Sequence, residues 1–190
     1  RNPSMKTITD IASASQVLAF WFEELTPAQW WHKDEALDAR IAQRFGATLA
    51  AARAAELAGW RDSAGGRLAE VIVLDQFSRN VFRDRAESFA ADGMALALAQ
   101  EAVRGGFDAQ LAPNERAFVY MPYMHSESGQ IHQDALRLFD QPGLENSLDF
   151  ERRHHAIIAR FGRYPHRNAI LGRESTAEEL AFLQQPGSSF

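Results

Sequence analysis

At residues 67–82 the chain reads RLAEVIVLDQFSRNVF. At the spacing of an α-helix, about 100° per residue, Leu68 and Val71 fall on one face. Leu74 and Phe77 cover much of the remaining surface. A helix that is apolar on nearly every side is typical of the centre of a fold. We therefore expect residues 67–82 to form the central helix.

Two charged residues lie in the middle of the apolar face of this helix. Asp75 and Arg79 are one helical turn apart, so they can pair with each other, and burial is costly for any ion that lacks a partner. One interpretation is a structural ion pair. The other is that the face opens into a pocket, where the pair meets a ligand. Asn80 and Arg83 lie off the face and are expected at the rim of that pocket.

Helical spacing of apolar residues continues on both sides of the central segment, and glycine pairs and prolines separate the helices. The other expected helices run from Ser13 or Ser15 to Leu25, and over residues 34–57, 89–104, 113–122, 130–139, 150–161 and 176–183. No alternation of apolar and polar residues is long enough for a strand. We expect an all-α fold of about 7–9 helices, packed as antiparallel helical hairpins in one domain.

The expected division of the chain follows from these helices. Residues 15–183 form the single all-α domain, and residues 184–190 form a frayed tail. Residues 1–14 are a lead-in, and the four residues before Met5 resemble the remnant of an expression tag.

The composition excludes several classes of protein. The chain has 190 residues, no cysteine and a net charge of −5. Without cysteine it has no disulfide scaffold, thiolate zinc site, Fe–S cluster or cysteine nucleophile. The net negative charge argues against nucleic-acid partners. The sequence contains no run of about 18 apolar residues, so we expect no membrane partner. We expect a cytoplasmic protein.

A second concentration of charge follows the helix expected at residues 150–161. His154 lies on the apolar stripe of that helix, as a hydrogen-bonded core histidine or as a ligand or base, and His155 points about 100° away. The next residues supply three arginines, a histidine and an asparagine: Arg160, Arg163, His166, Arg167 and Asn168. Such arginines form surface ion pairs, or they converge in a cleft and select carboxylate or phosphate.

A third group, at residues 120–127, reads YMPYMHSE. His125 fits a general base or a metal ligand, with Glu127 as the carboxylate that orients it. The segment equally fits the start of the next helix, with Ser126 as its N-cap. His32 and His132 have no chemical neighbours in sequence and are expected at the surface. No spacing of His125, Glu127, His154 and His166 matches a known metal motif, so we expect no metal and no cofactor.

Four short sequence motifs form one pattern. They are VLAFWF at 17–22, LDQFSRN at 74–80, MPYMHSE at 121–127 and RFGRYPHRN at 160–168. In this order they resemble a bacterial family catalogued as domain of unknown function 924, from about Ser15 to Leu183. Ser78 stands where the family has proline and Tyr164 where it has phenylalanine, and neither change alters a charged position. The resemblance implies a tetratricopeptide-like array of antiparallel helix pairs, and it implies no reaction.

Three functions fit these residues. The first, which we favour, is binding of a small phosphate- or carboxylate-bearing ligand, or of an acidic peptide end. The second is a hydrolase or lyase that acts on an anionic metabolite, with a histidine as general acid or base. The third is a protein–protein interaction scaffold with a structural polar network. The candidate ligand-binding residues are Asp75, Arg79, Asn80, Arg160, Arg163, His166, Arg167 and Asn168, and the candidate catalytic residues are His125, His154 and Glu127.

Overall fold

The computed structural model describes residues 10–190, so the expected tag remnant before Met5 lies outside the described residues. The α-helices are α1 (Ala14–Ala19), α2 (Pro27–Trp31), α3 (Glu35–Arg53), α4 (Ala64–Ile72), α5 (Ser78–Val81), α6 (Asp92–Arg104), α7 (Pro113–Met124), α8 (Gly129–Phe139), α9 (Glu145–Phe161) and α10 (Ala177–Phe182). Two π-helical turns, η1 (Phe20–Glu24) and η3 (Val73–Phe77), extend α1 and join α4 to α5. Short 3₁₀ turns lie in the connections: η2 (Ala58–Asp62), η4 (Ala86–Ser88), η5 (Asp108–Gln110) and η6 (Pro165–Arg167).

When each π-helical turn is counted with the helices that it continues, residues 10–190 form nine helices and no strand. The prediction of an all-α, single-domain fold is confirmed. Between residues 10 and 190, no helix is both long enough and apolar enough to cross a membrane.

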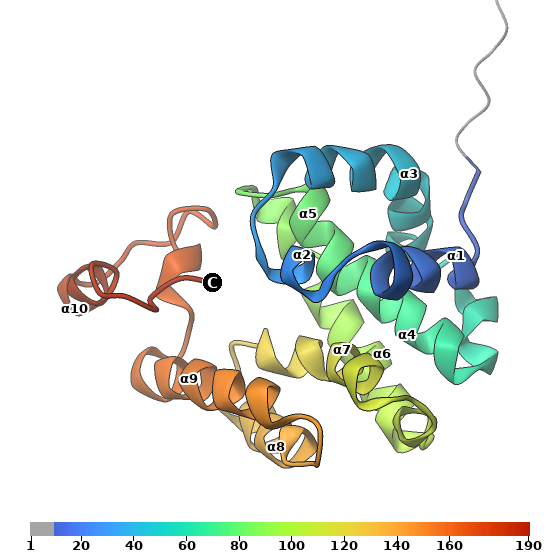
Figure 1. Ribbon diagram of the computed structural model, residues 1–190. Helices are drawn as coiled ribbons and strands as arrows, with labels where there is room; N and C mark the ends of the chain where they lie inside the picture. The colour runs from blue at the N-terminus through green and yellow to red at the C-terminus, as the bar shows by residue number, and fades with distance from the viewer. Residues whose placement is uncertain (1–9) are drawn as a thin grey trace, which may run out of the picture.

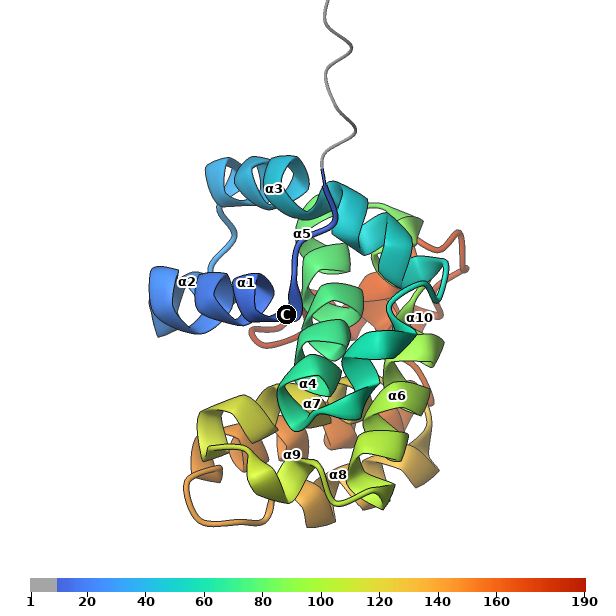
Figure 2. The same ribbon diagram turned by 90° about the vertical axis from the view of Figure 1, so that its right-hand side faces the viewer.

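Consecutive helices pack against one another: α3 on α5, α6 on α7, α7 on α8, and α8 on α9. Short connections make such neighbours antiparallel, as in stacked helical hairpins. In both views of the ribbon, α3 lies toward one end of the molecule and α8 and α9 toward the other, with α4 between them (Figures 1 and 2). Because α4 contacts α1, α6 and α7, it holds the central position that its sequence predicts.

The central rod is continuous from α4 through η3 to α5, and every residue from 68 to 78 is buried. The turn η3 contains Asp75, so the buried aspartate that the sequence predicts lies on a π-helical segment. Such π-helical segments are rare and occur frequently at functional sites. Helical periodicity predicts the rod, but it does not reveal the π-helical turn.

Three helix ends follow their sequence signals closely. Ser13 and Thr176 form capping boxes at the starts of α1 and α10. Helix α9 ends at Gly162, whose φ of 72° is the left-handed conformation that favours glycine. These three signals could be read from the sequence because they depend only on residues within one turn of the helix end.

Two helices are longer than the sequence predicts. Helix α7 continues through Pro122 to Met124, since a proline in the last turn removes only one backbone hydrogen bond near the end of the helix. Helix α9 begins at Glu145 and not at Phe150. The buried side chains of Leu144 and Leu148 attach this additional part of the helix to the core.

The last residues of the chain pack against the domain, where the sequence suggests a frayed tail. The Phe190 ring lies 3.8 Å from the His154 ring and 5.1 Å from the Tyr164 ring, centroid to centroid. Ser188 is buried, and its hydroxyl donates to the backbone oxygen of Leu183 at 3.1 Å. Aromatic contacts of this kind order a segment whose glycine, proline and serine content suggests mobility.

Gly66 lies at the start of α4, against the backbone of Trp60. A Cβ at Gly66 would lie 1.8 Å from the Trp60 carbonyl oxygen, so Gly66→Ala must displace backbone. We expect this substitution to lower the free energy of unfolding by about 1–3 kcal/mol in urea denaturation. Gly65→Ala is the matched control, because the nearest atom, Cδ1 of Leu18, would lie at an ordinary 3.4 Å. Alanine's better helix propensity should make the control more stable by about 0.5–1 kcal/mol, and equal effects at the two positions would contradict a steric clash at Gly66.

Candidate functional site

A pocket of about 360 Å³ opens between η4, the start of α6, the end of α7 and the segment that begins with η6. Phe89, Leu96, Pro122 and Leu171 contribute apolar wall. The polar wall is made by Asp92, His125, Ser126, Glu127 and Arg167. Two of the segments singled out by the sequence, residues 120–127 and 160–168, thus contribute to one pocket.

Asp75 and His125 form the buried end of this site. The carboxylate Oδ1 of Asp75 lies 2.8 Å from Nδ1 of His125, and its Oδ2 accepts a 2.8 Å hydrogen bond from the Gln76 amide. Burial raises the pKa of Asp75, but His125 and Arg79 outweigh that effect and lower the pKa to about 2. Asp75 is therefore ionised at neutral pH and only accepts hydrogen bonds, so the proton between the two residues resides on Nδ1 of His125.

His125 is the neutral member of this pair. Burial lowers the pKa of His125, the Arg79 cation lowers it further, and the Asp75 carboxylate opposes both effects. With its proton on Nδ1, the imidazole carries a lone pair on Nε2. His125 lines the pocket, and among the described residues its Nε2 has no hydrogen-bond partner.

Arg79 holds Asp92 more closely than the predicted partner Asp75. Its two terminal nitrogens donate to the two oxygens of Asp92 at 2.9 and 3.0 Å. Its contacts to Asp75 are a 2.9 Å bond to the backbone oxygen and a 3.4 Å contact to the carboxylate. The predicted pair therefore exists, but Asp92 is the main partner. No local pattern in the sequence indicates Asp92, because it is brought to Arg79 by the packing of α6 on η3.

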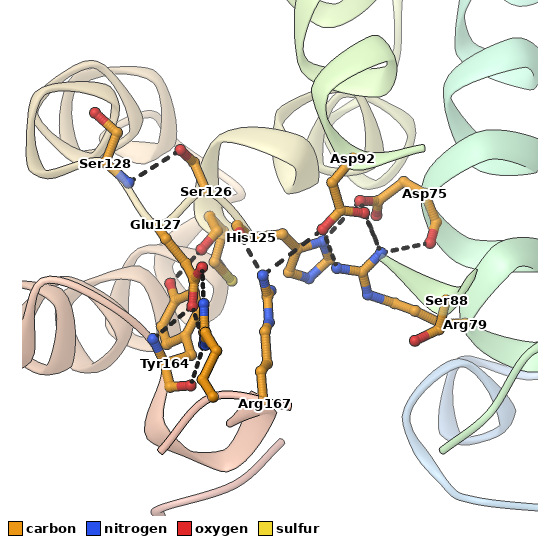
Figure 3. Close-up of polar contacts among 12 residues, drawn as sticks. Asp75, Arg79, Ser88, Asp92, His125, Ser126, Glu127, Ser128, Tyr164 and Arg167 are labelled. Atoms are coloured by element: carbon orange, nitrogen blue, oxygen red, sulfur yellow. Dashed lines mark hydrogen bonds and ion pairs between the residues drawn. The ribbon is translucent and has the colours of Figure 1, made fainter. Parts of the chain in front are cut away.

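Arg167 is the least neutralised cation of the site (Figure 3). Only 5% of the residue is exposed, and Nη2 donates to the backbone oxygen of His125 at 2.9 Å. Nη1 is 3.8 Å from Asp92, and the buried Nε has no partner. The guanidinium lies 4.5 Å from the ring centroid of Phe89 and 4.8 Å from that of Tyr164. Burial lowers the pKa of Arg167, and the nearby Arg79 cation lowers it further.

Glu127 does not orient His125, which corrects the sequence interpretation. Its carboxylate accepts two hydrogen bonds from Arg173, at 2.8 and 2.9 Å, and one from the backbone N–H of Tyr164 at 2.8 Å. Asp75 holds the imidazole instead, because the π-helical turn places it opposite the end of α7. The predicted N-cap at Ser126 is also wrong, since the Ser128 hydroxyl caps α8 by accepting from Ile131 N–H.

The arginines of residues 160–168 do not all converge on the pocket: one lines it, and the others pair with glutamates of α10. Arg160 pairs with Glu178 at 3.0 Å and Arg163 pairs with Glu179 at 2.7 Å, so neither lines the pocket. Asn168 is buried beside them and donates to Ser175 Oγ at 3.0 Å. These glutamates belong to the first turn of α10, and they neutralise the loop locally. Only Arg167 of this run reaches the pocket.

Asn80 and Arg83 are not at the pocket rim. Asn80 donates to Asp38 Oδ1 at 2.9 Å, and Arg83 donates to the same oxygen at 2.9 Å. Asp38 lies in the first turn of α3, so both residues attach the central rod to that helix. Their contribution is to the fold.

His154 and His166 lie in an aromatic cluster outside the pocket. His154 is buried, as its position on the helix predicts, and its Nδ1 lies 2.7 Å from the Phe150 carbonyl oxygen. Burial lowers the pKa of His154 to about 3. Burial and the Arg167 cation lower the pKa of His166 to about 4. Among residues 10–190, no three His, Asp or Glu side chains are grouped to hold a metal ion.

His132, expected at the surface, is fully buried. Its Nδ1 bonds to the carboxylate of Glu151, and its Nε2 is 2.7 Å from the Ser126 backbone oxygen and 3.1 Å from the Tyr164 hydroxyl. The partner lies on α9, which packs along α8. Neighbours in sequence could not reveal this pair, since α8 and α9 meet only in the folded chain.

The fold and the site together define a single-domain, all-helical protein with a buried aspartate–histidine pair and a buried arginine at one pocket. The chain belongs to the family of bacterial proteins of unknown function DUF924, whose model matches residues 17–187. It is similar to the structure of the protein of unknown function ATU0120 from Agrobacterium tumefaciens, with 40% sequence identity and a TM-score of 0.86. That similarity covers 90% of this chain and 96% of the other. No curated protein matches the chain.

Arg79→Ala tests how far the fold depends on the buried charges. The substitution leaves Asp92 without its two closest hydrogen-bond donors and removes a cation from Asp75, so we expect a loss of about 3 kcal/mol in the free energy of unfolding. Arg160→Ala is the control, because its ion pair with Glu178 is exposed and should contribute less than about 1 kcal/mol. Urea denaturation of both variants measures the difference, and similar losses would show that the buried pairs are not special.

The buried histidines predict a loss of stability in acid. Since the folded-state pKa values of His154 and His166 are lowered to about 3 and 4, the unfolded chain takes up these protons first as the pH falls below its ordinary histidine value of 6.5. Stability is therefore complete above that value and is lost progressively toward the folded-state values. Each such histidine contributes a slope of about 1.4 kcal/mol per pH unit between about pH 6 and pH 4.5. His154→Leu should reduce the measured slope by that amount, and an unchanged slope would contradict the assignment.

Proposed function

We propose that the pocket binds a small ligand that carries a carboxylate or phosphate group, and that Arg167 receives this group. The observation that carries the proposal is the state of Arg167, a buried guanidinium whose Nε has no partner and whose nearest carboxylate oxygen is 3.8 Å away. A buried cation is costly unless hydrogen-bonding anions compensate it. An anionic ligand in the pocket supplies that compensation.

The other arginines near the pocket support this choice. Arg79 is held by both oxygens of Asp92, and Arg173 by both oxygens of Glu127. Each of these guanidinium groups already donates two hydrogen bonds to one carboxylate, which is the contact that it would otherwise make to an anionic ligand. Of the described residues that line the pocket, Arg167 is the only arginine or lysine, so it is the group with capacity for an anion.

The pocket also limits the rest of the ligand. About 360 Å³ is at the small end of the usual range for ligand sites, roughly 300–1,000 Å³. Phe89, Leu96 and Leu171 supply apolar contact in the same pocket. We infer a compact acid with an apolar part, which includes the carboxylate end of a peptide. A cytoplasmic location fits this proposal and a cysteine-free chain.

The interaction-scaffold hypothesis accounts for a different set of residues. The pairs Arg79–Asp92 and Glu127–Arg173 connect separate segments and act as parts of the fold. They surround the pocket without depending on a ligand. The structural network and the binding site are therefore compatible within one molecule.

The test is calorimetry and thermal shift with benzoate, succinate and phenyl phosphate, with benzyl alcohol as the uncharged comparison. A ligand at about 100 times its Kd should add about 2.7 kcal/mol of stability to the wild type. Arg167→Gln should weaken binding about 10- to 100-fold, because a hydrogen bond to a charged group is worth about 1.5–3 kcal/mol.

Arg163→Gln is the matched control. Arg163 lies in the same loop as Arg167, but it pairs with Glu179 outside the pocket. The substitution should leave the Kd unchanged. Failure of every anion to stabilise the wild type, or equal binding by the Arg167→Gln variant, would contradict the proposal.

A further inference from the structure

A second feature of the pocket is the free nitrogen of His125. Nδ1 is fixed at 2.8 Å from the ionised Asp75 carboxylate, so the imidazole keeps the tautomer that has its lone pair on Nε2. Nε2 has no hydrogen-bond partner among the described residues, and His125 lines the pocket. A carboxylate that holds one nitrogen while the other faces a cavity is the arrangement of a general base.

The structure contains its own comparison for this arrangement. His132 is also paired with a carboxylate, that of Glu151, but both of its nitrogens are occupied and the residue is fully buried. That pair can stabilise the packing of α8 and α9 and has no access to a ligand. The pair of His125 and Asp75 differs because one nitrogen remains available in a pocket.

The base and the cation line the same pocket. Arg167 Nη2 donates to the backbone oxygen of His125 at 2.9 Å, so the guanidinium is held beside the residue that carries the imidazole. Figure 3 shows the Arg167 side chain beside His125, with Asp75 on the other side of the imidazole. Both residues line the pocket, so a ligand anchored by its anionic group at Arg167 lies in the same cavity as the imidazole.

Other acids and bases around the pocket are already engaged. Asp92 accepts two hydrogen bonds from Arg79, and Glu127 accepts two from Arg173. His154 and His166 do not line the pocket. A reaction here must therefore use a single acid–base group, and ester hydrolysis by water is a reaction that needs only one.

We propose that His125 acts as a general base in this pocket and that the pocket hydrolyses small carboxylic esters whose acyl part carries a free carboxylate. The inference rests on the proposed binding of that carboxylate by Arg167. Nε2 takes a proton from water while the water oxygen bonds to the ester carbonyl carbon. The tetrahedral intermediate then breaks its bond to the alcohol oxygen, which leaves with the proton from Nε2. The new carboxylic acid releases its proton to solvent, so the products are a dicarboxylate and an alcohol.

The test uses mono(4-nitrophenyl) succinate, whose hydrolysis releases coloured 4-nitrophenolate, and 4-nitrophenyl acetate as the ester without a carboxylate. His125→Asn removes the base, while its amide can still donate to Asp75 and preserve the buried contact. We expect kcat/KM for the succinate ester to fall about 10²- to 10⁴-fold in this variant. His155→Asn is the matched control, because this histidine on α9 does not line the pocket, and the variant should retain wild-type kcat/KM.

Two further measurements separate the base from the binding site. Arg167→Gln should reduce the preference for the succinate ester over the acetate ester about 10- to 100-fold, as the ratio of the two kcat/KM values. The Kd for succinate, measured by calorimetry, should be the same in His125→Asn and wild type within about threefold. A folded His125→Asn variant is shown by an unchanged far-ultraviolet spectrum and cooperative melting.

The outcomes distinguish the two proposals. If succinate binds but the wild type hydrolyses the ester no faster than His125→Asn, the catalytic inference is overturned and the binding site stands. If succinate does not bind and no hydrolysis occurs, both are overturned. Hydrolysis lost in His125→Asn with succinate binding retained supports the base.

Discussion

The buried carboxylate of Asp75 is the constraint on which this structure depends. It lies in the core on the central rod, where an ion without partners would be strongly destabilising. The protein surrounds it with donors from two directions, Gln76 and Arg79 on its own rod and His125 at the end of α7. Because His125 comes from α7 and the carboxylate from the central rod, this one buried charge connects two helices.

The arginines extend this constraint outward. Arg79 binds Asp92 at the start of α6, and Arg167 approaches the same carboxylate from η6. Four segments distant in sequence therefore meet around alternating charges. An arrangement of alternating positive and negative side chains is stable where every polar group has a partner. Arg167 is the exception, because its buried Nε has no hydrogen-bond partner. The pocket lies at this residue, which links the energetics of the fold to its capacity to bind an anion.

Much of the fold, and the burial of the Asp75–Arg79 pair, could be predicted from the sequence, but the pairing of Asp75 with His125 could not. Helical periodicity places Asp75, Arg79 and His154 on buried faces, because that property depends on one helix at a time. It cannot identify what faces them. Asp92 and Glu151 reach their partners only through packing of separate helices, and Arg163 finds a glutamate on α10 instead of the pocket. A run of arginines in one loop is a matter of composition, whereas convergence requires three-dimensional placement.

The two histidine–carboxylate pairs show why residue type alone does not decide function. The pair of His132 and Glu151 resembles the pair of His125 and Asp75, since each joins an imidazole to a buried carboxyl group. In the first pair the protein saturates both imidazole nitrogens, so the interaction serves packing. In the second pair one nitrogen is bonded and the other has no partner among the described residues, and His125 lines the same pocket as the incompletely neutralised Arg167. The two pairs differ in how many of their polar atoms lack a hydrogen-bond partner within the protein. A polar atom without such a partner at a pocket is available to a ligand.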